Sequence, residues 1–146
     1  MLRPIAIATA ISGTLDILFA MILTVAFGRN IGDMLRFVAS GPFPEAMNMR
    51  TGGAVLGLVV HFALMAIMAT ALMLLLWWKP ARLETPLLTG ITFGVVTYFA
   101  MNWAVVPLRF GTPLPPKTLS IVTQLFAHLA LVGIPATFIT SRFLRA

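Results

Sequence analysis

The chain of 146 residues contains no cysteine and only four acidic residues. The absence of cysteine excludes disulfides, thiolate nucleophiles, iron–sulfur clusters and zinc sites with cysteine ligands. Charged residues make up 10% of the chain, whereas they make up about a quarter of a soluble domain. Because 60% of the residues are hydrophobic, lipid is the expected solvent, and we expect one transmembrane domain spanning residues 1–146.

The chain also lacks the motifs of several function classes. Its ten basic residues give a net charge of +6, but they lie singly, without the interleaved aromatic residues of a nucleic-acid interface. Basic residues placed at the ends of apolar segments typically anchor helices at lipid headgroups. No Ser/His/Asp motif, phosphate loop or HExxH sequence is present. We therefore expect no nucleic-acid partner and no enzymatic activity.

Four long apolar segments are present, each near the roughly 20 residues that cross a hydrocarbon core. They predict an all-α fold, a transmembrane four-helix bundle. Proline residues stand before helix starts, and Trp77, Trp78 and Trp103 lie near helix ends, as headgroup anchors do. The first segment is too long for a cleaved signal peptide and contains Asp16, so we expect it to be retained. The predicted spans are residues 4–27, 53–78, 86–107 and 119–140.

The three links between the spans differ in character. Residues 79–85 predict a short turn, and residues 108–118 form a proline-rich loop. Within residues 28–52, the apolar spacing over 31–40 predicts a short interfacial helix that Gly41 and Pro42 would end. An irregular loop packed on the bundle is the alternative interpretation.

The charge distribution gives little information on orientation, because the basic residues divide five to five between the two sides. Arg3 and the free amine precede the first span, and Arg142 and Arg145 follow the last. Positive charge at these ends favours cytoplasmic termini.

The second and fourth spans resemble each other. Residues 61–70 and 128–137 are identical at six of ten positions without a gap. The first and third spans share a hydroxyl residue before glycine, at 12–13 and 89–90. One interpretation is a duplicated pair of parallel helical hairpins. Chance similarity between apolar segments is the other.

Polar residues inside the predicted spans are the candidate ligand-binding or proton-handling groups. Four of them lie eight to twelve residues from a helix start, roughly 12–18 Å deep at 1.5 Å per residue, and so near the bilayer midplane. Ionisable groups at this depth are costly and usually functional. The candidates are Asp16, His61, Tyr98, Asn102, Gln124 and His128.

Glycines at four-residue spacing share helix faces with these polar groups. One stripe joins Gly53, Gly57 and His61, and another joins Gly90, Gly94 and Tyr98. Since GxxxG pairs let helices approach closely, we expect these faces to turn inward and gather the polar residues into one central cluster.

The predicted cluster is open to four interpretations. In the first, the cluster binds a small ligand, lipid, proton or protein partner in a transporter-like protein or an accessory subunit of a larger membrane complex. In the second, His61 and His128 are axial ligands of haem b. In the third, Asp16, His61 and His128 form a two-histidine, one-carboxylate metal site. In the fourth, the cluster is a purely structural clamp between helices. Homo-oligomers are a further prediction from the glycine faces.

Several short motifs resemble those of a family of short bacterial integral membrane proteins without an assigned activity. They are Gly13-Thr-Leu-Asp-Ile17, Gly52-Gly53 with Leu56-Gly57 and His61-Phe62, Val105-Val-Pro-Leu108, and His128 with Val132-Gly-Ile-Pro135. This resemblance extends over nearly the whole chain. It implies a four-helix fold in a bacterial inner membrane and assigns no catalytic residue.

Overall fold

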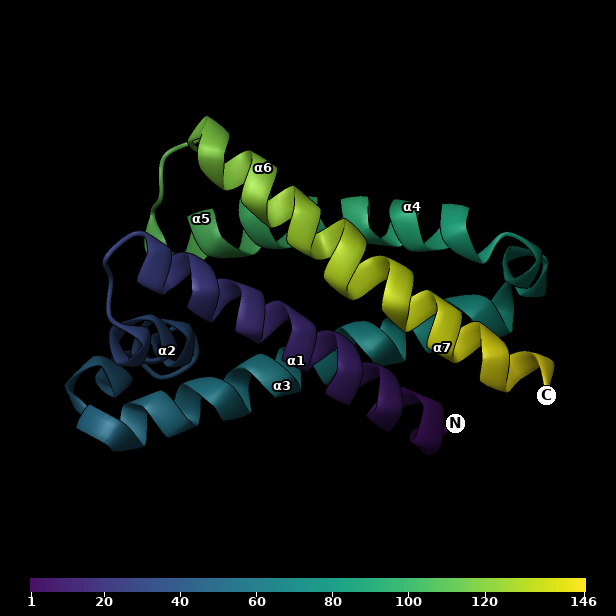
Figure 1. Ribbon diagram of the computed structural model, residues 1–146, viewed down its shortest axis with the longest axis horizontal. Coiled ribbons are helices and arrows are strands. Elements are labelled where there is room, and N and C mark those ends of the chain that lie inside the picture. The colour runs from purple at the N-terminus through teal and green to yellow at the C-terminus, as the bar shows by residue number, and fades with distance from the viewer.

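The computed structural model describes all residues from 1 to 146 and contains helices but no strands (Figure 1). Four helical rods are long and apolar enough to cross a membrane. The predicted all-α bundle is therefore confirmed, and the spans agree to within a few residues. The rods are α1 (Leu2–Ala26), α3 (Arg50–Trp78), the run of α4 (Pro86–Phe99), η3 (Ala100–Val105) and α5 (Val106–Phe110), and the run of α6 (Thr118–Phe126), η4 (Ala127–Gly133) and α7 (Ile134–Arg145).

In Figure 1 the last rod runs from α6 at the top to α7 at the lower right, and it packs against α1. Helix α1 packs against α3 and also against η4 and α7, while α4 packs against η4 and α7. The two termini lie at the same end (Figure 1). A small core lies there, in which alanines on facing helices permit close approach: Ala8, Ala69, Leu72, Leu76 and Ala136.

Helix α2 (Ile31–Ser40) has the bounds that the sequence predicted. The side chain of Asn30 caps its start by accepting a hydrogen bond from the Asp33 backbone nitrogen at 3.1 Å. It is seen end-on in Figure 1, so it runs across the direction of α1 and α3. A 3-10 helix (Pro44–Asn48) completes the link to α3. The segment is thus a helix rather than an irregular loop.

The glycine pair of α3 packs against α2 and the 3-10 helix that follows it, rather than against another transmembrane helix. A side chain at Gly57 would overlap the backbone of Leu35, and one at Gly53 would overlap the carbonyl of Ala46. The close neighbour of this pair is thus the link before α3 and not one of the other three rods. GxxxG spacing creates a smooth surface but does not choose what covers it.

Two π-helical segments interrupt the third and fourth rods, at Ala100–Val105 and at Ala127–Gly133. Each is followed by one residue and then a proline, Pro107 or Pro135. Proline lacks the backbone N–H and clashes with the carbonyl four residues earlier. A wider π turn accommodates that clash without ending the helix, and it places His128 in an irregular turn.

Candidate functional site

The six candidate residues lie in three places rather than in one cluster, so the prediction of a single central cluster was wrong. Asp16 faces His61 across the α1–α3 contact. Tyr98 and Asn102 lie on the third rod, and Tyr98 contacts His128 of η4. Gln124 lines a groove elsewhere on α6. The division arises because α3 packs against α1 while η4 packs against α4, so His61 faces α1 and His128 faces α4.

Asp16 and His61 face each other near the middle of their helices. The Nδ1 atom of His61 lies 3.9 Å from Oδ2 of Asp16. This distance exceeds that of a hydrogen bond, and the contact is an ion pair only when His61 is protonated. The side chain of His61 is 9% exposed and that of Asp16 is 21% exposed. The carboxyl group is thus partly accessible while the imidazole is enclosed.

The second ring nitrogen of His61 fixes its tautomer. Nε2 lies 2.9 Å from the carbonyl oxygen of Gly13. Because a carbonyl only accepts, Nε2 must carry the hydrogen that it donates. The proton that His61 can gain or lose is therefore on Nδ1, the atom that faces Asp16. Sequence reasoning missed this role of Gly13, which it noted only as part of two short motifs.

His128 forms the second group, with Thr97 of α4. Its Nδ1 atom lies 3.1 Å from Oγ1 of Thr97. The Thr97 hydroxyl donates its one proton to the carbonyl of Gly94, at 3.1 Å. Oγ1 must then accept from Nδ1–H, which leaves Nε2 of His128 as the unprotonated nitrogen. Sequence analysis missed Thr97, which has no mark beyond its place beside Tyr98.

The remaining polar groups of the third rod surround Tyr98. Its ring lies edge-on to that of His128, with centroids 6.0 Å apart. Trp103 donates from Nε1 to the Tyr98 hydroxyl at 3.2 Å. Asn102 donates to the Tyr98 backbone carbonyl at 3.3 Å, within its own helix. Asn102 therefore supports the turn instead of contacting a histidine.

Glycines bring the third and fourth rods together at this second group. A side chain at Gly94 would lie 2.5 Å from the His128 carbonyl oxygen and 2.9 Å from Cα of Leu129. One at Gly90 would lie 2.8 Å from Cα of Ile134. This close approach of backbones puts the His128 ring within reach of Thr97.

The positions of the histidines decide how well the cofactor interpretations fit. Asp16, His61 and His128 do not gather into a group of three that could hold a metal ion. A bis-histidine haem needs a free ring nitrogen on each histidine. His61 has none in this arrangement, because Nε2 contacts the Gly13 carbonyl and Nδ1 faces Asp16. In this arrangement the residues therefore fit neither the metal site nor the bis-histidine haem.

Buried hydroxyl groups without a hydrogen-bond partner form a feature that the sequence analysis largely overlooked. Two lie on α1 and three on α7, and these helices pack together. Unpaired polar groups are costly in apolar surroundings. Thr9, Ser12 and Asp16 are spaced by three and four residues, so they share one face of α1. The five residues are Thr9, Ser12, Thr137, Thr140 and Ser141.

Together, the four apolar rods and the polar groups enclosed between them define a multi-pass α-helical membrane protein. No known protein family, curated protein or solved structure matches the chain. The resemblance to short bacterial membrane proteins therefore stays a prediction.

Proposed function

We propose that this chain is a non-enzymatic, transporter-like membrane protein that binds and passes protons at the Asp16–His61 pair. The observation that carries the proposal is the geometry of His61. Its Nε2–H is held by the Gly13 carbonyl, so its exchangeable proton faces the carboxyl group of Asp16. Histidine and carboxylate side chains inside a membrane are the usual carriers of protons through it.

The charge of the pair supports this role. Ionised Asp16 with protonated His61 has no net charge, and neither does the doubly neutral form. Exchange between these two forms therefore adds no net charge to the hydrocarbon. A proton taken up from outside does change the net charge by one, which is unfavourable at low dielectric constant. The pair can thus hold one proton, whereas binding of a second proton is unfavourable.

The buried hydroxyls support access to the pair from the end that holds the termini. Thr9 and Ser12 continue the Asp16 face of α1 toward that end, and α7 carries the other three. A hydroxyl group both donates and accepts a hydrogen bond, as a proton path requires. These unpaired groups are the polar feature that a simple apolar bundle would lack.

We expect Asp16→Asn to abolish proton flux, because asparagine keeps the size of the side chain but cannot bind a proton. The measurement is proton uptake into liposomes that contain the purified protein and an internal pH-sensitive dye, driven by a potassium diffusion potential. Flux through the variant should equal that of protein-free liposomes.

His128→Gln is the matched control, because His128 is equally deep but pairs with Thr97 instead of an acid. It should retain most of the wild-type flux. No flux above the protein-free rate for the wild-type chain would overturn the proposal. So would full flux through Asp16→Asn.

We also propose a bacterial inner-membrane location with cytoplasmic termini. The charges at Arg3, Arg142 and Arg145 and the family resemblance support it. Since the chain has no cysteine, single cysteines can report the orientation. A maleimide that cannot cross the inner membrane should label Asn48→Cys in intact cells and leave Ala81→Cys unlabelled. The reverse pattern would place the termini outside.

A further inference from the structure

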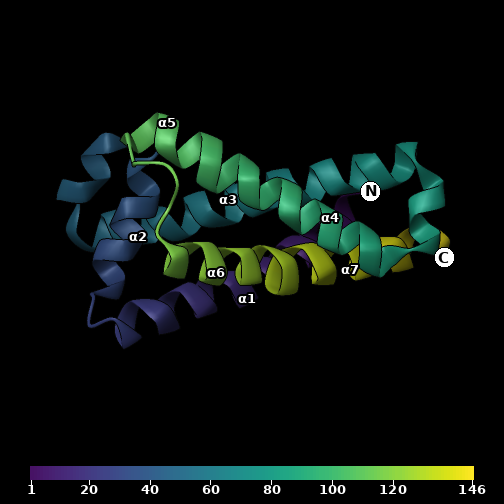
Figure 2. The ribbon, with the colours of Figure 1, turned by 90° about the horizontal axis from the view of Figure 1, so that it is seen from above.

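A groove of about 450 Å³ lies at the end of the bundle away from the termini. It is formed by the last turns of α1, by α2 and by the start of α6, which lie together in Figure 2. Neither Asp16 nor His61 lines it, so it is separate from the proposed proton site. The lining residues that matter here are Leu23, Phe27, Arg29, Phe37, Lys117 and Gln124.

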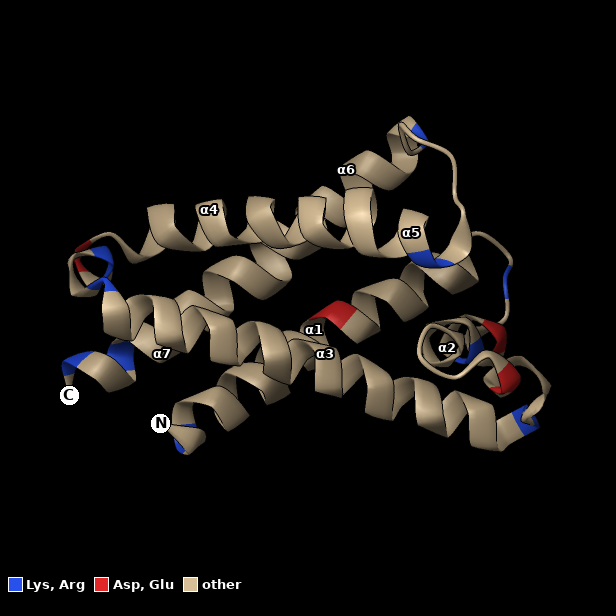
Figure 3. Ribbon diagram, turned by 180° about the vertical axis from the view of Figure 1, so that it is seen from behind, with Lys and Arg blue, Asp and Glu red and all other residues tan.

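Two basic side chains, Arg29 and Lys117, lie in this groove without an anionic partner. Asp33 pairs with Arg36 and Asp16 faces His61, and the groove lining contains no acidic residue. The guanidinium carbon of Arg29 lies 5.7 Å from the centroid of the Phe27 ring. Figure 3 shows basic residues at the start of α6 and on the link after α1. Charge complementarity therefore calls for an anion here.

The inner part of the groove is apolar with a few polar groups. The step from Lys117 to Gln124 is two helical turns, or about 10 Å, as is the step from Phe27 to Ala20. Leu23, Phe27 and Phe37 provide apolar walls along this length. At the inner end, the Gln124 amide can donate to an ester carbonyl. The groove thus matches a molecule that is anionic at one end and apolar beyond it.

We infer that this groove binds an anionic phospholipid, with its phosphate at Arg29 and Lys117 and one acyl chain along Leu23 and Phe37. Basic pockets beside membrane helices recognise lipid headgroups in this way. A free phosphate ion would satisfy the two cations but leave the apolar walls uncovered.

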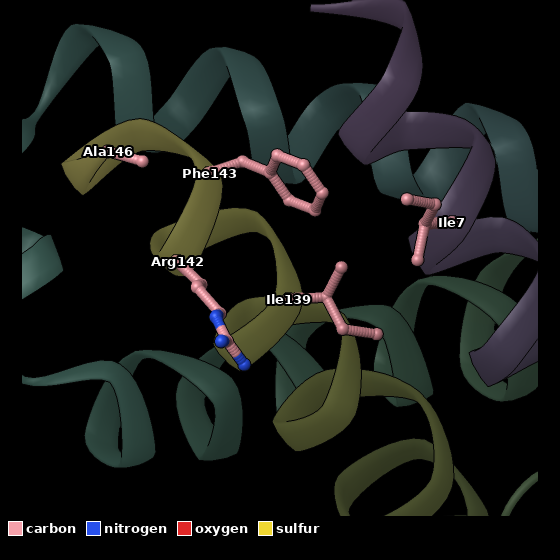
Figure 4. A pocket seen from close by; sticks show the side chains of 5 residues that line it. All are labelled: Ile7, Ile139, Arg142, Phe143 and Ala146. Carbon is pink, nitrogen blue, oxygen red and sulfur yellow. The ribbon is translucent and has the colours of Figure 1, made fainter.

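Another hollow, at the end with the termini, lacks these features (Figure 4). It is lined by Ile7, Ile139, Phe143 and Ala146, with Arg142 as its one charged residue. The side chain of Arg142 points away from Ile7 and Phe143 (Figure 4). Its apolar walls alone do not discriminate between lipids.

The test is photo-crosslinking of the full chain in bilayers that contain a small fraction of a probe lipid. One probe is phosphatidylglycerol with a diazirine on its acyl chain, and the other is phosphatidylcholine with the same chain. Crosslinked peptides are mapped by mass spectrometry. We expect the phosphatidylglycerol probe to label residues 20–37 and 117–124, and the phosphatidylcholine probe to label them weakly.

The double variant Arg29→Gln/Lys117→Gln should reduce this labelling by roughly thirtyfold, because each basic residue contributes roughly fivefold. Lys79→Gln/Arg82→Gln removes the same charge at the other end and should leave it unchanged. Ser120→Phe fills the groove without changing its charge, and this variant should abolish labelling of the groove. All variants alter exposed or half-buried positions, and circular dichroism checks their folding.

Three results would overturn the inference. The two probes could label the groove equally, which would indicate unselective lipid contact. The Arg29/Lys117 double variant could be labelled like the wild type. Millimolar inorganic phosphate could displace the probe completely, which would assign the cations to a free anion.

Discussion

His61→Ala is expected to lower the free energy of unfolding by about 3 kcal/mol, as other large-to-small changes at buried sites do. The change removes the hydrogen bond to Gly13 and leaves the Asp16 carboxyl group without its only charge partner. Interhelical polar contacts in membranes contribute about 1–2 kcal/mol at most, so the lost packing supplies the remainder. Unfolding by sodium dodecyl sulfate, followed by tryptophan fluorescence, measures the effect.

His61→Gln separates the structural part of this role from the protonic part. The glutamine amide can donate to the Gly13 carbonyl as Nε2–H does, but it cannot gain or lose a proton. We expect this variant to unfold within about 1 kcal/mol of the wild type and to show no proton flux. A stable variant with wild-type flux would show that His61 serves only as a clamp between α1 and α3.

Gly94→Ala is expected to destabilise the bundle by about 1–3 kcal/mol, the usual cost of overpacking. The new methyl group would lie 2.5 Å from the His128 carbonyl oxygen and 2.9 Å from Cα of Leu129. Backbone atoms cannot rotate aside, so the third and fourth rods must separate. That separation also breaks the contact between Thr97 and His128.

Gly52→Ala is the matched control for this change, because nothing lies within 4 Å of the methyl group that it adds. It should have no measurable cost. The same detergent titration compares the two variants. Equal stability of Gly94→Ala and the wild type would mean that the rods are not held by close backbone contact at this position.

The short helix α2 was predictable from its own residues, whereas its packing was not. Asn30, Asp33 and the Gly41-Pro42 pair define its start and end through local hydrogen bonds and backbone limits. Its packing on Gly53 and Gly57 depends on how all the helices are arranged around those glycines. A glycine stripe is equally suitable for several neighbours, so its sequence cannot select one.

In the candidate site, too, some features were predictable from the sequence and others were not. Depth along a helix follows from residue count, so Asp16 and His61 could be placed near the midplane before any fold was known. Their pairing, and the pairing of His128 with Thr97, depend on the rotation and order of four rods. The hydrogen bond to the Gly13 carbonyl involves a backbone atom, which every residue possesses, so the residue type gave no sign of it.

The amino-acid sequence was enough to predict an all-α membrane bundle, because apolar length and scarce charge leave few other ways to satisfy the backbone in lipid. It also predicted which polar groups lie near the middle of the long helices. The fold was needed to learn that these groups are separate, that Gln124 lines a basic groove, and that α2 and the 3-10 helix after it cover the α3 glycines. These outcomes depend on contacts between helices, and many helix orders satisfy the same apolar pattern equally well.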